Sequence, residues 1–110
     1  MNGTSVKALP IQVSKDKIIE YCQRWSIAEL AVFGSILRED FKRTSDIDVL
    51  VSFKADTKWT LLDHIQMQDE LATLLGRKVD LVNRRGIENS RNHIRREAIL
   101  NSAEVIYASA

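Results

Sequence analysis

The sequence predicts an α/β (α+β) fold, in which a small sheet carries packed helices within one domain. The chain has 110 residues, a length that suits one domain with a sizeable core. Its residues are 45% hydrophobic and 28% charged, a balance typical of folded globular proteins and not of disordered ones. Helix-type and strand-type hydrophobic patterns alternate along the chain, which indicates helices packed on a sheet.

The first residues are expected to form an arm rather than part of the domain. Residues 1–13 contain the only proline of the chain and show no sustained hydrophobic periodicity. We therefore divide the sequence into an N-terminal arm over residues 1–13 and a domain over residues 14–110.

A helix and a strand open the predicted domain. Ser14 suits a helix N-cap. Apolar residues then recur at i, i+4 and i+7, which predicts the buried face of a helix that ends near the last of them: Ile18, Cys22 and Trp25. Residues 28–33 form a short apolar run stopped by Gly34 and Ser35, and we interpret this run as a strand.

Two further strands flank a long helix. Residues 46–53 and 78–83 have the composition of strands. Between them, residues 59–75 predict an amphipathic helix that ends at Gly76. Its expected apolar face consists of Leu61, Ile65, Leu71, Ala72 and Leu75.

The last elements are a helix and a closing strand. Ser90 suits the cap of a helix that runs through Ile99, with Ile94 and Ala98 one turn apart on the same face. Residues 104–108 are expected to form a short strand.

Charge and cysteine content exclude several classes of protein. Sixteen Lys and Arg residues against fifteen Asp and Glu give a net charge of +1, so no global field favours nucleic acid or a membrane surface. Cys22 is the only cysteine, which excludes an internal disulfide and a thiolate metal cluster. No apolar run reaches membrane-spanning length or resembles a signal-peptide core, so we expect a cytoplasmic protein.

Two aspartates stand in what is otherwise predicted to be a buried strand. Asp46 and Asp48 are two residues apart, so their side chains point to the same face. Burying unpaired carboxylates costs on the order of several kcal/mol, and two like charges side by side call for a cation. Oxygen ligands favour a hard ion such as Mg²⁺. Asp80 repeats the pattern in the next strand, and three converging carboxylates would be enough for a two-metal site.

Gly34 and Ser35 suggest a place for phosphate. A strand that ends in glycine, followed by a small hydroxyl residue that opens a helical turn, exposes backbone N–H groups suited to phosphate oxygens. Alone, the pair is better explained as a tight turn. Beside a carboxylate metal site, it indicates phosphoryl or nucleotidyl transfer.

These residues together resemble a known family. Gly34-Ser35, ten residues and then Asp46-Ile47-Asp48 give the pattern G-S-x10-D-x-D, which is similar to the signature of the DNA polymerase β-like nucleotidyltransferase superfamily. Asp80, in the stretch KVDLV, matches the third carboxylate of that family. The small size, and Arg38 three residues after Ser35, resemble the minimal nucleotidyltransferases, which include the MntA-type antitoxins. The resemblance runs from about residue 28 to residue 107.

The resemblance implies a polymerase β-like palm fold, with a small mixed sheet, and a role for each matching carboxylate. Asp46 and Asp48 would hold two Mg²⁺ ions, one of them on the triphosphate of ATP. Asp80 would share the second ion and help to deprotonate an acceptor hydroxyl.

The resemblance also implies the residues that bind the nucleotide. Gly34 and Ser35 would hold the outgoing pyrophosphate, and Arg38 would neutralise it. Ser45 is placed in the same group, where it would steady the loop rather than act as a nucleophile, since no histidine is near in sequence to activate it. Glu39 departs from the family pattern, which often has glycine there, and a carboxylate near the triphosphate puts donor affinity or metal dependence in doubt.

The implied partner is a protein. A chain of this length has no room for a domain that holds an acceptor, and the minimal family implies a HEPN-domain ribonuclease toxin whose tyrosine receives AMP. The alternatives are a nucleotidyltransferase acting on a small molecule or RNA, and a non-catalytic antitoxin that neutralises its partner by binding. Direct nucleic-acid binding is not expected.

The remaining polar and aromatic residues are interpreted more simply. Residues 77–97 hold seven basic and three acidic side chains, which indicates a solvated face, with nucleotide phosphate or an acidic partner surface as the alternative. We expect the other residues of note to be packing or surface residues, with Trp59 near a nucleotide base as an alternative: Tyr21, Trp25, Trp59, His64, His93 and Tyr107.

Overall fold

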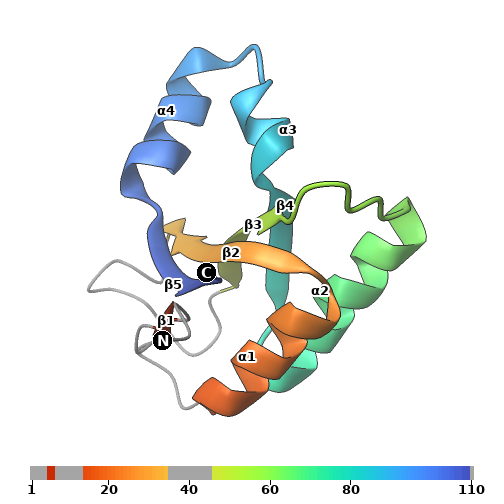
Figure 1. Ribbon diagram of the computed structural model, residues 1–110. Helices are drawn as coiled ribbons and strands as arrows, with labels where there is room; N and C mark the ends of the chain where they lie inside the picture. The colour runs from red at the N-terminus through yellow and green to blue at the C-terminus, as the bar shows by residue number, and fades with distance from the viewer. Residues whose placement is uncertain (1–4, 7–13, 35–45, 110) are drawn as a thin grey trace.

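A mixed five-stranded sheet forms the centre of the protein (Figure 1). The computed structural model describes residues 5–6, 14–34 and 46–109. Along the described chain the elements are β1 (Ser5–Val6), α1 (Lys15–Arg24), β2 (Ile27–Phe33), β3 (Ile47–Phe53), α2 (Leu61–Leu75), β4 (Val79–Asn83), α3 (Arg84–Glu88), α4 (His93–Ser102) and β5 (Glu104–Ala108). The strand order is β1-β5-β2-β3-β4. Only β3 and β4 are parallel neighbours among these strands; the other pairs are antiparallel.

Helix α1 agrees with the sequence prediction. It ends at Arg24, and the predicted stripe is buried: Ile18, Cys22 and Trp25. Ser14 stands at the N-cap position, although its side chain makes no capping hydrogen bond. Burial raises the pKa of the Cys22 thiol to about 12, so this cysteine is a packing residue.

Helix α2 has clear capping residues at both ends, and its buried face agrees with the prediction only in part. Thr60 and Asp63 form a capping box, and Gly76 ends the helix in the left-handed conformation, at a φ of 67°. The prediction for Leu61 and Ile65 is wrong, because 76% and 46% of their surfaces are exposed. The prediction is confirmed for Leu71 and Leu75, which are buried together with Met67, a residue that was not predicted. Two apolar stripes overlap on this helix, and periodicity alone could not say which of them the strands would cover.

The segment after β4 also differs from the prediction. A short helix, α3, was not expected, and α4 begins at His93 rather than near Ser90. Asn92 caps α4 by accepting a hydrogen bond from the backbone N–H of Arg95. Ile94, predicted to share an apolar face, is 86% exposed.

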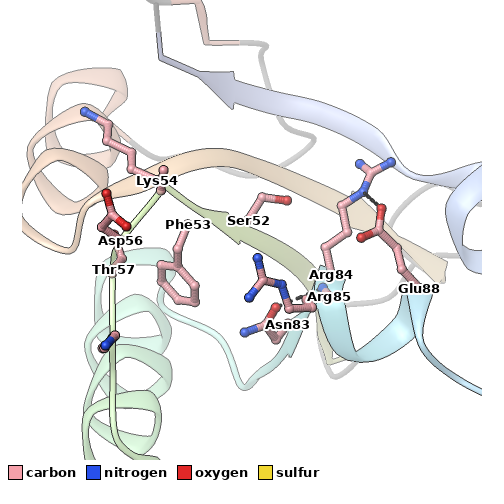
Figure 2. A pocket seen from close by; sticks show the side chains of 11 residues that line it. Ser52, Phe53, Lys54, Asp56, Thr57, Asn83, Arg84, Arg85 and Glu88 are labelled. Atoms are coloured by element: carbon pink, nitrogen blue, oxygen red, sulfur yellow. Dashed lines mark hydrogen bonds and ion pairs between the residues drawn. The ribbon is translucent and has the colours of Figure 1, made fainter.

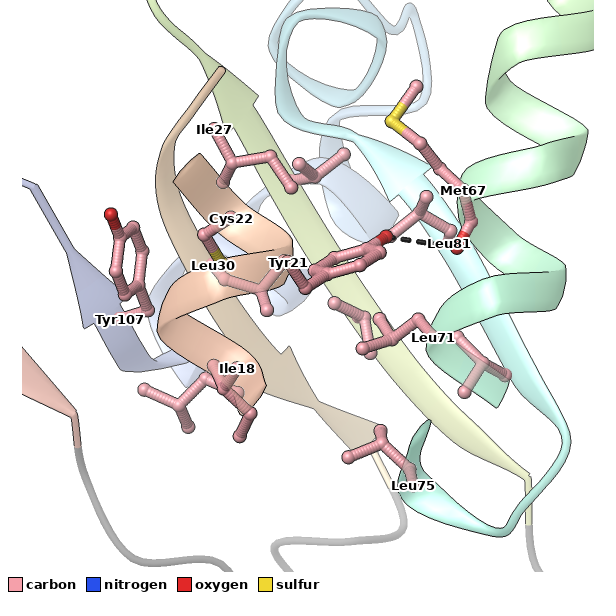
Figure 3. Packing of buried hydrophobic residues seen from close by; sticks show 14 of the residues in the cluster. Ile18, Tyr21, Cys22, Ile27, Leu30, Met67, Leu71, Leu75, Leu81 and Tyr107 are labelled. Carbon is pink, nitrogen blue, oxygen red and sulfur yellow. Dashed lines mark hydrogen bonds between the residues drawn. The ribbon is translucent and has the colours of Figure 1, made fainter. Parts of the chain in front are cut away.

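The two faces of the sheet carry separate cores. Helices α1 and α2 cover one face, where alternate residues of β3 and β4 join a large cluster that Figure 3 shows. In it, the Tyr21 hydroxyl donates to the Met67 carbonyl oxygen across 2.9 Å, tying α1 to α2. The opposite face has a smaller cluster between the sheet and the helices α3 and α4: Ala31, Phe33, Leu50, Ile87 and Ile99.

Part of the predicted arm joins the sheet. Ser5 and Val6 form β1, which pairs with Ala108 and Tyr107 of β5 at the edge of the sheet. Among the described residues, no helix combines the length and the apolar character needed to cross a bilayer.

Candidate active site

Two aspartates lie side by side near the start of the parallel strand pair. The register of β3 and β4 sets Asp48 opposite Asp80. Neighbouring strands lie about 4.8 Å apart, and paired residues of a parallel ladder present their side chains to the same face. Leu50 shares a face with Asp48 and belongs to the smaller core, so both carboxylates lie on the face that α3 and α4 cover.

The expectation of buried aspartates is wrong for two of the three. Asp46, which directly precedes β3, and Asp80 are exposed, whereas Asp48 is half-buried. The strands are apolar because α1 and α2 bury their other face. On the face of the carboxylates, the cover is incomplete, so water reaches Asp46 and Asp80.

Gly34 brings the main chain against the Asp48 carboxylate. Gly34 directly follows β2, whose last residue, Phe33, pairs with Asp48. Its φ is 75°, in the left-handed region that favours glycine. A Cβ atom on Gly34 would also overlap the Oδ2 atom of Asp48. Two separate features therefore favour glycine at this position: the backbone conformation and the closeness of the carboxylate.

A hollow of about 310 Å³ opens between the sheet and α4 at this point. Its walls come from the sheet and from one face of the helix: Phe33, Gly34, Asp48, Asp80, Arg95, Ala98, Ile99 and Ser102. It combines a main-chain turn, two carboxylates and a guanidinium in one place.

The carboxylates of the site repel one another. Partial burial raises the pKa of the Asp48 carboxyl, and the charges of Asp80 and then Asp46 raise it further, while Arg95 acts in the opposite direction. The net shift is upward. An added cation would relieve this repulsion.

The donor set fits Mg²⁺ as a pair of ligands. Asp48 and Asp80 offer only oxygen atoms, and Mg²⁺ commonly takes one or two carboxylates and completes its shell with water and phosphate. Among the described residues, no three His, Cys, Asp or Glu side chains gather closely enough to hold a metal ion. The three-carboxylate arrangement with Asp46 therefore stays a prediction.

Sequence reasoning missed the contribution of α4. Arg95 was considered only as part of a basic run, yet it faces the Asp48 carboxylate across the hollow. The signal in the sequence was the spacing i, i+3, i+4 and i+7, which places four residues on one face of a helix: Arg95, Ala98, Ile99 and Ser102.

Several predicted site residues lie outside the described part of the chain. These are Ser35, Arg38 and Ser45, together with the departure at Glu39. Their assignments stay predictions.

The other residues of note have structural partners. His64 donates from Nε2 to the Leu81 carbonyl oxygen across 2.7 Å. Trp59 donates to the Trp25 carbonyl oxygen, and the two indole rings meet edge to face, with centroids 5.1 Å apart. Tyr21 and Tyr107 are buried, in agreement with a packing role.

Comparison with known protein families decides the class of the chain. Residues 15–105 match the model of the nucleotidyltransferase domain family. The chain belongs to this family. The match covers every element from α1 into β5, so the domain, and not an isolated motif, carries the similarity.

The nucleotidyltransferase is also a homologue of protein adenylyltransferases. It is 36% identical over 89 residues to a protein of Methanocaldococcus jannaschii provisionally named a protein adenylyltransferase, covering 81% of this chain and 89% of the relative. It is 41% identical over 63 residues to the protein adenylyltransferase MntA of Thermococcus cleftensis, covering 57% of this chain and 62% of MntA. This chain therefore spans just under two thirds of the length of several of these relatives.

Solved structures agree with the fold. A provisionally assigned minimal nucleotidyltransferase superposes with a TM-score of 0.61 at 35% identity, covering 81% of this chain and 85% of that one. A toxin–antitoxin structure with AMP-PNP gives a TM-score of 0.67 at 23% identity, covering 88% and 75% of the two chains. A structure from Shewanella oneidensis, of a tri-AMPylated HEPN toxin in complex with MNT antitoxin, gives a TM-score of 0.58 at 22% identity. The match covers 86% of this chain and 69% of that one. The predicted polymerase β-like fold, with a mixed sheet, is confirmed.

Proposed function

We propose that this nucleotidyltransferase is the antitoxin of a two-protein module and transfers AMP from ATP to a tyrosine of a HEPN-domain ribonuclease toxin, with Mg²⁺. The observation that carries the proposal is the pairing of Asp48 with Asp80 below the Gly34 main chain. Similarity to MntA, a protein adenylyltransferase, supports the reaction. The AMPylated HEPN toxin found with a structural neighbour supports the partner.

The carboxylates would hold the metal. Asp48 and Asp80, joined by Asp46, are the residues we assign to two Mg²⁺ ions. Bound Mg²⁺ would neutralise the triphosphate and favour loss of the acceptor proton.

The turn after β2 would bind the phosphates. The N–H groups at Gly34 and Ser35 would hold the pyrophosphate portion of ATP, with Arg38 as its counter-charge and Ser45 as support for the loop. Arg95, on the opposite wall of the hollow, suits a phosphate oxygen.

The transfer itself needs no nucleophile from this chain. The tyrosine oxygen of the toxin attacks the α-phosphorus of ATP and forms a new P–O bond. The bond from the α-phosphorus to the bridging oxygen breaks, and pyrophosphate leaves with the electron pair. Asp80 is the base that accepts the tyrosine proton. The rate enhancement comes from positioning and charge stabilisation.

Intact mass spectrometry of the co-expressed toxin tests this proposal. Wild-type protein is expected to add one or more AMP units to the toxin, and the Asp46→Asn, Asp48→Asn variant none. The variant Asp69→Asn, at an exposed aspartate of α2, is the matched control and should act as wild type. An unmodified toxin in every sample would refute the proposed AMP transfer.

A binding antitoxin is the second candidate. The lack of a three-residue metal cluster among the described residues favours it. A toxin-growth assay separates the two functions. A pure binder would still neutralise the toxin with Asp46→Asn, Asp48→Asn, whereas the enzyme would not.

A further inference from the structure

A second, larger hollow lies away from the aspartates, at the carboxyl ends of β3 and β4. It measures about 500 Å³ and is lined by the end of β3 with its following loop and by the end of β4 with α3 (Figure 2). Asp48 and Asp80 lie near the beginning of the same two strands. The two hollows therefore open at opposite ends of one parallel strand pair.

The chain changes faces at this second hollow. After β3 it passes to α2, which packs on the face of the large core. After β4 it passes to α3 and α4, which pack on the opposite face. In α/β sheets, the crevice between two such diverging connections at the carboxyl ends of the strands is a common place for ligands.

Positive charge exceeds negative charge in this hollow. Its lining includes four cations and two carboxylates: Lys54, Lys58, Arg84, Arg85, Asp56 and Glu88. Arg84 already has partners, since its guanidinium pairs with Glu29 and Glu88. For the Arg85 guanidinium, the described residues supply no carboxylate within ion-pair distance.

The side chains at the centre are donors placed around an aromatic ring. Figure 2 shows the Arg85 guanidinium next to the Asn83 amide, with the Phe53 ring to one side of both, while Arg84 turns away towards Glu88. The Asn83 Oδ1 atom accepts the backbone N–H of Arg85 across 2.9 Å, which leaves the amide N–H₂ group of Asn83 to face a ligand. Ser52 adds a hydroxyl. The Phe53 ring is half-buried against the large core and lines the hollow with its remaining surface. Donors beside a partly accessible ring suit an anion that carries a flat ring.

We propose that this hollow is a second binding site, for a nucleoside phosphate, separate from the Asp48 and Asp80 site. Arg85 binds the phosphate as a two-pronged donor, with the amide of Asn83 beside it. The base lies on the Phe53 ring, a contact that tolerates any base because every base has a stacking face. The ligand is either a free nucleotide or a nucleotide of an RNA strand, since both present the same chemistry.

Two-dimensional NMR of the full chain in EDTA tests the site with three probes: inorganic phosphate, AMP and a hexa-adenylate RNA. We expect AMP to shift the amide signals of residues 52–58 and 83–88. Arg85→Gln should weaken AMP binding about tenfold, as loss of one charge-assisted contact predicts. Arg91→Gln removes the same charge from an exposed arginine outside the hollow and should leave AMP binding unchanged.

Two comparisons define the ligand. Phe53→Leu keeps an apolar side chain but removes the ring, so it should weaken AMP several-fold and leave phosphate unchanged. RNA that binds tighter than AMP with the same Arg85 dependence identifies a strand as the source, and equal or weaker RNA binding identifies the free nucleotide.

Failure of this site is distinct from failure of the proposed transfer reaction. Arg85→Gln is expected to leave AMP transfer to the toxin intact. The second site is refuted by AMP shifts confined to Gly34, Asp48 and Asp80, by no shifts at millimolar AMP, or by equal losses in the Arg85→Gln and Arg91→Gln variants.

Discussion

At Gly34 the main chain passes so close to the Asp48 carboxylate that a Cβ atom on Gly34 would overlap it. The charges that act on Asp48 also come from residues of the same site. Among the described residues, Arg95 is the cation that offsets the repulsion of Asp48 by Asp80 and Asp46. Small changes at these positions should thus affect catalysis more than folding.

Gly34→Ala tests that contact, with Gly76→Ala as its matched control. Both glycines have a positive φ, 75° and 67°, so each substitution should lower the free energy of unfolding by about 1 kcal/mol. The two positions differ in the room for a side chain. A Cβ atom on Gly34 would overlap the Asp48 carboxylate, whereas nothing lies within 4 Å of a Cβ atom on Gly76. AMP transfer should fall roughly 100-fold in Gly34→Ala alone. Denaturant titration and single-turnover transfer measure the two effects, and equal activity in both variants would contradict the account.

At the scale of elements, some helices stabilise the sheet and another borders the active site. Helices α1 and α2 stabilise the sheet from one face, whereas α4 closes the active-site hollow from the other. Substitutions in the first pair should act on stability, and those on the inner face of α4 should act on substrate binding.

Arg95→Gln is expected to raise the KM for ATP about tenfold with little change in kcat, because the variant loses one charge-assisted phosphate contact. Arg91→Gln, with the same change of charge just before α4, should leave KM unchanged. Arg95→Lys should restore part of the affinity. A merely structural Arg95 would instead lower the melting temperature and leave KM alone.

Glu70 joins α1 to α2 and should make stability depend on pH. Burial raises the pKa of its carboxyl, but hydrogen bonds from Arg24 and Trp25 lower it more, and the net pKa lies below its usual value of 4.5. The stabilisation is therefore present above pH 4.5 and is lost as the pH falls through the lowered pKa. Glu70→Gln should cost about 1 kcal/mol at neutral pH and less in acid. Urea unfolding at several pH values measures this, and a cost that does not vary with pH would refute it.

On the scale of the whole molecule, the sequence predicted the order of the elements except β1 and α3, and it suggested, without establishing it, that the two site strands pair. Alternation placed Asp48 on one face, and the similar frame around Asp80 suggested the neighbouring strand, which the parallel register confirms. Side-chain exposure was harder to predict. An apolar strand does not reveal that one face is closed by α1 and α2 while the other stays partly open, so Asp46 and Asp80 were expected to be buried.

Contacts between distant segments could not be predicted from local pattern. The approach of Arg95 to Asp48, and the choice of Met67 over Leu61 for the core, depend on how helices dock on the sheet. The hollow at Arg85 likewise depends on the divergence of two connections, a property of the complete fold.

The central claim is that the paired aspartates catalyse transfer of AMP to a toxin. The most direct measurement follows labelled phosphate from ATP to the purified HEPN toxin, with the label at either the α- or the γ-position. The account predicts that the α-label alone reaches the toxin, that Asp48→Asn reduces its transfer roughly 100-fold, and that Asp69→Asn does not. Transfer of the γ-label, or α-label transfer that survives Asp48→Asn, would contradict it.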